Sequence, residues 1–107
     1  MPATIRVLGQ AAPAATVETA LYICATTSAV ISTLNICNFS GTMDSFTVRV
    51  CVGGAGDANE QLLFYLASIP ANTTVTDTIG ITVATTDVIK VTSTNGTCAF
   101  TAFGQEQ

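Results

Sequence analysis

Hydrophobic and polar residues alternate over most of this chain, as they do in β-strands that bury one face. The clearest stretch runs from Ala29 to Val52, where two alternating segments flank the short polar segment Ser40–Ser45. A short polar segment between two such runs is typical of a turn. The stretch therefore predicts a long antiparallel hairpin, on which the other strands pack their apolar faces.

Similar alternation predicts further strands, about eight in all. They cover Thr4–Leu8, Val17–Cys24, Gln61–Ser68, Thr73–Val83, Asp87–Thr94 and Thr97–Phe103. Between the first two of these, the small and Pro-containing segment Gly9–Thr16 predicts an extended linker. Gly80 predicts a bulge or bend inside the strand Thr73–Val83.

The last two predicted strands are joined by Asn95-Gly96. This dipeptide favours a type I′ turn, because both central residues of that turn need a positive φ. A two-residue turn would place Val91 opposite Phe100 in one sheet, with the apolar residues on one face. The segment therefore predicts a second hairpin.

Short strands at regular spacing are typical of a β-sandwich or a jelly roll. We expect an all-β fold: one antiparallel β-sandwich domain over residues 1–107, jelly-roll-like, with an N-terminal strand and linker at residues 1–16. The alternation assigns six residues to its core, namely Leu34, Ile36, Val48, Val50, Val91 and Phe100.

The segment Gln61–Ser68 is apolar on both faces. One face carries Leu62, Phe64 and Leu66, and the other carries Leu63 and Tyr65. A strand that is apolar on both sides is either central in a sheet or buried against another subunit. We expect Leu63, Tyr65 and Tyr22 to lie at a subunit interface.

The chain has few charges: they make up 9% of its 107 residues, against about 25% in ordinary globular proteins. With three basic residues and a net charge of −4, it lacks the clustered cations that phosphate binding needs. Nucleic acid is therefore not an expected partner. The mean hydropathy is +0.54, and few charged residues guard the strand edges. We expect copies of the same chain to cover much of the surface.

No apolar run reaches the roughly 20 residues of a membrane-spanning helix, so a membrane is not an expected partner. Residues 1–16 lack the basic region and apolar core of a secretory signal. The sequence favours a protein made in a cytoplasm.

The four cysteines, Cys24, Cys37, Cys51 and Cys98, show no C-x-x-C spacing, and the chain has no histidine. Both facts argue against a zinc site. Without a secretion signal, free thiols are expected. The predicted central hairpin leaves a Cys37–Cys51 bridge open as an alternative.

The absence of histidine excludes Ser-His-Asp and Cys-His nucleophile systems. Acidic residues fall mostly in turns or at strand ends, and no pattern pairs two of them as a general acid and base. No catalytic, cofactor-binding or metal-binding residue is expected, and an enzyme is the weakest interpretation. Tyr22, Tyr65 and Phe103 could form a stacking platform for a sugar, although exposed aromatic residues more often belong to a subunit contact.

Several short segments follow one another along nearly the whole chain: Ile5–Gln10, Pro13, Leu21-Tyr22, Ser32–Leu34, Cys37-Asn38, Phe64–Pro70, Gly80-Ile81 and Asp87-Val88. In this order the segments resemble small virion structural proteins of tailed bacteriophages. The resemblance implies a β-sandwich that decorates a capsid or sits in a tail or fibre assembly. It implies no catalytic residues.

The resemblance and the low charge favour a capsid decoration (cement) protein of the virion that binds the particle as a homo-oligomer, such as a trimer. Its expected partners are copies of itself and other virion proteins such as the major capsid protein. Two alternatives stay open: a tail or fibre component that contacts the host surface, and a carbohydrate-binding module. A sugar binder should bind glycans as a purified monomer, whereas a virion protein should depend on assembly.

Overall fold

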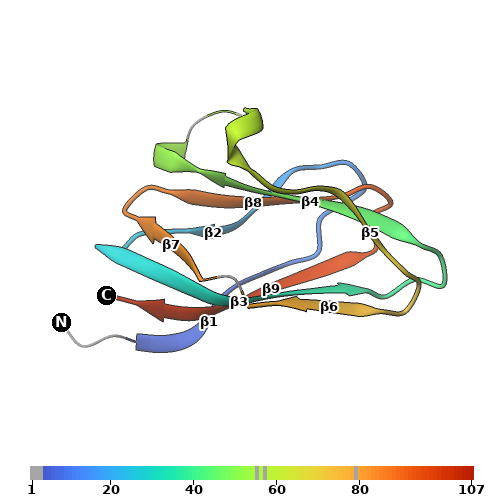
Figure 1. Ribbon diagram of the computed structural model, residues 1–107, viewed down its shortest axis with the longest axis horizontal. Helices are drawn as coiled ribbons and strands as arrows, with labels where there is room; N and C mark the ends of the chain where they lie inside the picture. Colours follow the sequence, from blue (N-terminus) through green and yellow to red (C-terminus); the bar gives the residue numbers. More distant parts are fainter. Residues whose placement is uncertain (1–3, 55, 57, 79) are drawn as a thin grey trace.

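The computed structural model describes residues 4–54, 56, 58–78 and 80–107, which form two antiparallel sheets packed face to face (Figure 1). The strands in these ranges are β1 (Thr4–Ala11), β2 (Thr19–Ile23), β3 (Ser28–Asn38), β4 (Asp44–Cys51), β5 (Leu62–Ile69), β6 (Thr74–Asp77), β7 (Ile81–Ala84), β8 (Val88–Ser93) and β9 (Cys98–Glu106). Two short 3-10 helices, η1 (Val52–Gly54) and η2 (Asn59–Gln61), lie between β4 and β5.

The two sheets share one simple topology. Sheet A has the strand order β1-β9-β3-β6, with β7 also pairing with β3, and sheet B has the order β2-β8-β4-β5. The first half of the chain thus pairs with the second half in reverse: β1 with β9, β2 with β8, β3 with β6 and β7, and β4 with β5. Such a folded double ribbon is a jelly roll. The predicted fold class, an all-β antiparallel sandwich, is confirmed.

The long hairpin predicted from Ala29 to Val52 is wrong. β3 belongs to sheet A and β4 to sheet B, so the segment between them crosses from one sheet to the other. Both strands bury an apolar face in the same core, and alternation does not distinguish neighbours in one sheet from strands in facing sheets. The buried Asn38 holds the crossing, since its Nδ2 donates to Thr42 O at 2.9 Å and to Ile69 O at 3.2 Å.

The second predicted hairpin, through Asn95-Gly96, is also wrong. β8 lies in sheet B and β9 in sheet A, and of the two turn residues only Gly96 has a positive φ, of 75°. A type I′ turn needs positive φ at both. The carboxylate of Asp44 accepts hydrogen bonds from the amides of Asn95 at 2.9 Å and Thr97 at 3.3 Å. These bonds stabilise a wider crossing in place of a tight turn.

Two predicted boundaries also change. β1 continues to Ala11 and takes up the first part of the predicted linker. The segment Thr73–Val83, predicted as one strand, forms β6 and β7, which pair with different parts of β3. Gly80 lies between them with a φ of 59°, in agreement with the predicted bend. The other strands lie where they were predicted, with their ends shifted by a few residues.

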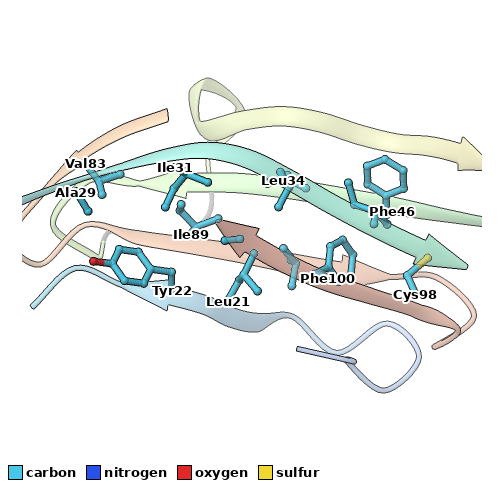
Figure 2. Close-up of a cluster of buried hydrophobic side chains, with 14 of the residues drawn as sticks. Leu21, Tyr22, Ala29, Ile31, Leu34, Phe46, Val83, Ile89, Cys98 and Phe100 are labelled. Atoms are coloured by element: carbon cyan, nitrogen blue, oxygen red, sulfur yellow. The ribbon is translucent and has the colours of Figure 1, made fainter. Parts of the chain in front are cut away.

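The core lies between the sheets, where apolar side chains of both layers point toward one another (Figure 2). Five of the six predicted core residues are buried: Leu34, Ile36, Val48, Val91 and Phe100. Val50 packs against the core but is only partly buried, because β5 pairs with β4 only as far as Arg49. The rings of Phe46 and Phe100 meet edge to face across the two sheets, with their centroids 6.2 Å apart.

The four cysteines are free thiols. Cys37 lies on β3 in sheet A and Cys51 on β4 in sheet B, so the bridge that a hairpin would have allowed has no structural basis. Cys51 is buried away from the main core, with its Sγ 3.4 Å from Oε1 of Gln61 in η2. The β4–β5 connection therefore covers this thiol.

Candidate functional site

A polar cluster joins the sheet crossings at one end of the sandwich. It consists of Asn38, Asp44, Ser93 and Thr97, and these four residues are termed the polar cluster. Oδ2 of Asp44 accepts from Ser93 Oγ at 2.5 Å and from Thr97 Oγ1 at 2.9 Å. Thr97 Oγ1 also lies 3.0 Å from Oδ1 of Asn38. The cluster therefore connects the crossing after β3 to the crossing after β8.

Asp44 is the charged centre of this cluster and is 3% exposed. Burial alone would raise its pKa, but hydrogen bonds from Ser93, Asn95, Ser45 and Thr97 outweigh burial and hold the pKa of Asp44 well below its ordinary value. The carboxylate is thus ionised at neutral pH, and hydrogen-bond donors of the protein occupy its oxygens. Such a group anchors loops and is a poor general base.

Cys98, whose side chain is of a kind that can act as a nucleophile, contacts this cluster: its Sγ lies 3.3 Å from Oδ2 of Asp44. Burial raises the pKa of the Cys98 thiol to about 11, so the thiol stays protonated at neutral pH and donates to the carboxylate. A reactive cysteine needs a lowered pKa instead. The cluster therefore offers hydrogen bonds and no thiolate.

A second buried carboxylate, Glu106, lies at the other end of β9. It is 8% exposed, accepts from the hydroxyl of Tyr22 at 2.5 Å and forms an ion pair with Arg6. The hydrogen bonds from Tyr22 and then Arg6 lower the pKa of Glu106, and burial raises the pKa of Tyr22. These contacts tie β1 and β9 of sheet A to β2 of sheet B.

The prediction that Tyr22 lies at a subunit interface is wrong. Tyr22 is 6% exposed, and its ring points into the core (Figure 2). The reason is a bulge in β2: Ala20 pairs with Lys90 and Tyr22 with Ile89, which leaves Leu21 as an extra residue. A bulge re-aims side chains, so Leu21 and Tyr22 are both buried.

The suggested sugar platform is not assembled by the fold. Tyr22 is buried, Tyr65 lies on β5 of sheet B and Phe103 lies on β9 of sheet A. The three aromatic side chains therefore do not share one surface.

The other two predicted interface residues are exposed on β5, one of the two edge strands of sheet B. Leu63 is 43% exposed, Tyr65 is 65% exposed and the neighbouring Leu66 is 51% exposed. These three residues are termed the ridge. Neighbouring large apolar side chains on an unpaired sheet edge are typical of association sites.

Leu66 departs from the prediction that it shares a face with Leu62 and Phe64. β5 places two residues, Tyr65 and Leu66, opposite the single residue Thr47 of β4, which is a β-bulge. Leu66 adopts a φ of 48°, and its amide donates to Thr47 Oγ1 at 3.2 Å. Left-handed backbone costs a residue such as leucine about 1–2 kcal/mol. The fold thus holds an apolar side chain outward at an energetic cost.

An open apolar groove of about 540 Å³ crosses the outer face of sheet A. Its apolar lining comes from Ile5 and Val7 of β1, Val30 of β3 and Phe103 of β9, and Arg6 also borders it. These lining residues and the hollow between them are termed the groove. Ile5 is 81% exposed and Phe103 is 39% exposed.

Two bulges explain why the groove forms where it does. Leu8 is an extra residue in β1 beside the step from Ala102 to Phe103 in β9, and Ser32 is an extra residue in β3 beside the step from Phe103 to Gly104. Bulges on both flanks bend the sheet beside Phe103. At Gly104 the strands approach so closely that a Cβ would lie 1.9 Å from Val30 O, so only glycine fits there. The same bulge in β1 turns Leu8 toward the core while Val7 stays exposed.

Sequence reasoning identified part of these surfaces. It singled out Leu63, Tyr65 and Phe103 as exposed candidates, and it missed Leu66, Ile5 and Val7. One signal for β1 was present, since apolar residues occur on both faces of Thr4–Leu8. A strand that is apolar on both faces at a sheet edge cannot bury both of them within one domain.

Among the described residues, no cluster of three or more cysteine, aspartate or glutamate side chains could hold a metal ion. The described part of the chain also contains no helix that is long and apolar enough to span a membrane.

Comparisons of the chain with protein-family models, with curated proteins and with solved structures found no match. Apart from the resemblance to tailed-phage virion proteins described in the sequence analysis, the function is therefore inferred from the geometry of the chain itself.

Proposed function

We propose that this protein is a structural component of a bacteriophage virion, a decoration protein that binds the capsid through apolar contacts repeated by symmetry. The ridge is the observation that carries the proposal. Leu63, Tyr65 and Leu66 lie exposed on an edge strand, and Leu66 is held outward by left-handed backbone. Strain that persists at a surface is expected where that surface has a function.

The ridge is also unprotected. Edge strands of soluble monomers are usually blunted by lysine, proline or inward-pointing charge. β5 has the sequence LLFYLASI and contains neither a charged residue nor a proline. Association through such a surface would continue without limit unless a closed, symmetric arrangement of subunits covers it. Decoration of a particle supplies such an arrangement.

The class of particle rests on the resemblance to tailed-phage virion proteins, and the fold is compatible with it. Jelly rolls occur in viral capsid domains and also in lectins, so the fold alone does not choose between a virion protein and a sugar binder. The separation of Tyr22, Tyr65 and Phe103 favours the virion protein, because a sugar platform needs aromatic rings on one surface.

A binding assay with undecorated capsids tests the proposal. We expect the purified chain to sediment with the capsids, and Tyr65→Lys to reduce the bound amount at least about tenfold, since the charge must be desolvated. Ile23→Lys is the matched control: Ile23 is 58% exposed on β2, the other edge strand of sheet B. It should bind like the wild type.

Circular dichroism shows whether each variant keeps its fold. Binding to tails in place of capsids would overturn the capsid location in favour of a tail component. A wild-type chain that ignores both and binds glycans as a monomer would overturn the virion assignment.

A further inference from the structure

We infer that the ridge of one copy of this chain seats in the groove of a second copy, so that the chain assembles head to tail. This inference rests on the proposed function only in requiring that the chain associates with itself. It names the two surfaces that meet and the residues at their centre.

The two surfaces match in chemistry, since both are mainly apolar. The ridge presents the side chains of Leu63, Tyr65 and Leu66 from a bulged edge strand. The groove is a hollow of about 540 Å³ whose lining is mainly apolar, and Phe103 forms part of that lining. Its volume lies within the range of about 300–1,000 Å³ that is typical of binding clefts. An aromatic side chain such as that of Tyr65 would cover the apolar lining.

The fold keeps these two surfaces apart within one molecule. The groove lies on the outer face of sheet A over β1, β9 and β3, whereas the ridge lies on β5 at the edge of sheet B. β5 is at the opposite edge of sheet B from β2, the strand that contacts β1 (Figure 1). The ridge therefore cannot fill the groove of its own chain. Contact between unlike surfaces is heterologous, and it gives a closed ring when the rotation between copies closes.

Charge supports the same pairing. Arg6 borders the groove, and its side chain is 55% exposed although it also binds Glu106. Glu60 in η2 is exposed a few residues before the ridge. Arg49, the base on the neighbouring strand, is bound by Glu18 and donates to Ala58 O at 2.9 Å. A partly exposed guanidinium thus borders the groove and an exposed carboxylate lies just before the ridge. Pairing of these two groups favours contact of a ridge with a groove over contact between two ridges.

Mixing two variants tests this head-to-tail arrangement. Tyr65→Lys removes the ridge and keeps the groove, whereas Phe103→Lys removes the groove and keeps the ridge. Light scattering should show each variant alone as a monomer of 11.0 kDa, at concentrations where the wild type is larger. An equimolar mixture retains one intact ridge and one intact groove. It should form a dimer of twice that mass and no larger species.

Several results would overturn the inference. A mixture that stays monomeric, while the wild type assembles, shows that the ridge of one copy does not seat in the groove of another. Assembly by Phe103→Lys alone shows that the groove is not the partner of the ridge, and both of these results leave the proposed virion role intact. A wild type that is monomeric throughout removes self-association altogether.

Two control variants show whether a loss of assembly has another cause than the loss of the ridge or the groove. Val7→Lys, at a groove residue that is 44% exposed, replaces Phe103→Lys if that variant unfolds. Ile23→Lys should assemble like the wild type, because Ile23 belongs to neither surface. A fatty acid that fills the groove should prevent the two variants from forming a dimer. If a fatty acid binds the groove but the wild type does not assemble, the inference is contradicted.

Discussion

The polar cluster and the ridge differ in which side chains they expose to solvent. In the polar cluster, Asp44 is almost fully buried and its oxygens accept hydrogen bonds from Ser93, Thr97 and Asn95. In the ridge, Tyr65 and Leu66 are more than half exposed. The molecule thus satisfies its charged group internally and leaves apolar groups open. The difference indicates that the polar cluster holds the fold together, whereas contacts with other molecules are apolar.

Both regions depend on departures from regular strand structure. The polar cluster organises crossings between the sheets, and the ridge and groove arise at β-bulges. Bulges are enriched at sheet edges and near functional sites, where they re-aim side chains. Substitutions that separate folding from association can therefore test whether the two regions have different roles.

The largest expected effect on stability comes from a core phenylalanine of β9, and a second phenylalanine of the same strand serves as the comparison. Phe100 is 1% exposed in the core and Phe103 is 39% exposed in the groove. Phe100→Ala should lower the free energy of unfolding by about 3–5 kcal/mol, because it leaves a cavity. Phe103→Ala should cost about 1 kcal/mol or less and should weaken assembly instead. Urea denaturation measures both, and a loss under about 1 kcal/mol for Phe100→Ala would contradict the core assignment.

The next effect concerns the polar cluster. Asp44→Ala should lower the free energy of unfolding by at least about 2 kcal/mol, because Ser93 and Thr97 lose a buried acceptor. Thr76→Ala is the control, since Thr76 is exposed on the edge strand β6. The same denaturation experiment compares the two variants. Equal, small losses would show that the cluster does not hold the crossings.

Acid should act on the two buried carboxylates, Asp44 and Glu106, and not on the ridge. The folded-state pKa values of Asp44 and Glu106 both lie below their ordinary values of 3.8 and 4.5. Lowered carboxyl pKa values stabilise the folded state above the ordinary pKa, and this stabilisation is lost as the pH falls through the folded-state values. The melting temperature should therefore fall steeply below pH 4.5.

Asp44→Asn is the control for this titration. It removes one of the two carboxylates, so its melting temperature should be lower near neutral pH and change less in acid. A variant that keeps the full acid dependence of the wild type would show that Asp44 does not cause it.

How much of this could be read from the sequence depends on the regularity of each strand. Alternation placed Leu34, Val48 and Phe100 in the core, because these residues lie in regular parts of their strands. It could not tell a neighbouring strand from a facing one, since both bury the same face. The two hairpins were therefore mispredicted, and the hydrogen bonds of Asp44 to distant amides carry no local signal.

Bulges account for most of the other errors. Leu21 and Ser32 are extra residues in their strands, and no glycine or proline marks them in the sequence. An extra residue reverses the inward and outward faces beyond it. The exposure of Leu66 and the burial of Tyr22 were missed for this reason. Tyr65 is the first of the two bulge residues, keeps its outward direction, and was placed correctly.

The smallest expected effect has opposite signs for folding and association. Leu66 has a left-handed backbone that asparagine tolerates better than leucine. Leu66→Asn should raise the free energy of unfolding by about 1 kcal/mol or less, because it relieves this strain. It should also weaken assembly, because it removes an apolar side chain from the ridge. A variant that is less stable and assembles normally would remove the functional reason for the strain.

The mass of the wild-type chain in solution tests the central claim most directly, which is that exposed apolar surfaces carry the function. Light scattering over a range of concentrations should show a defined multiple of 11.0 kDa that stops increasing, and Tyr65→Lys should remain at 11.0 kDa. A wild-type mass of 11.0 kDa at every concentration would contradict the claim. So would a Tyr65→Lys variant that assembles like the wild type.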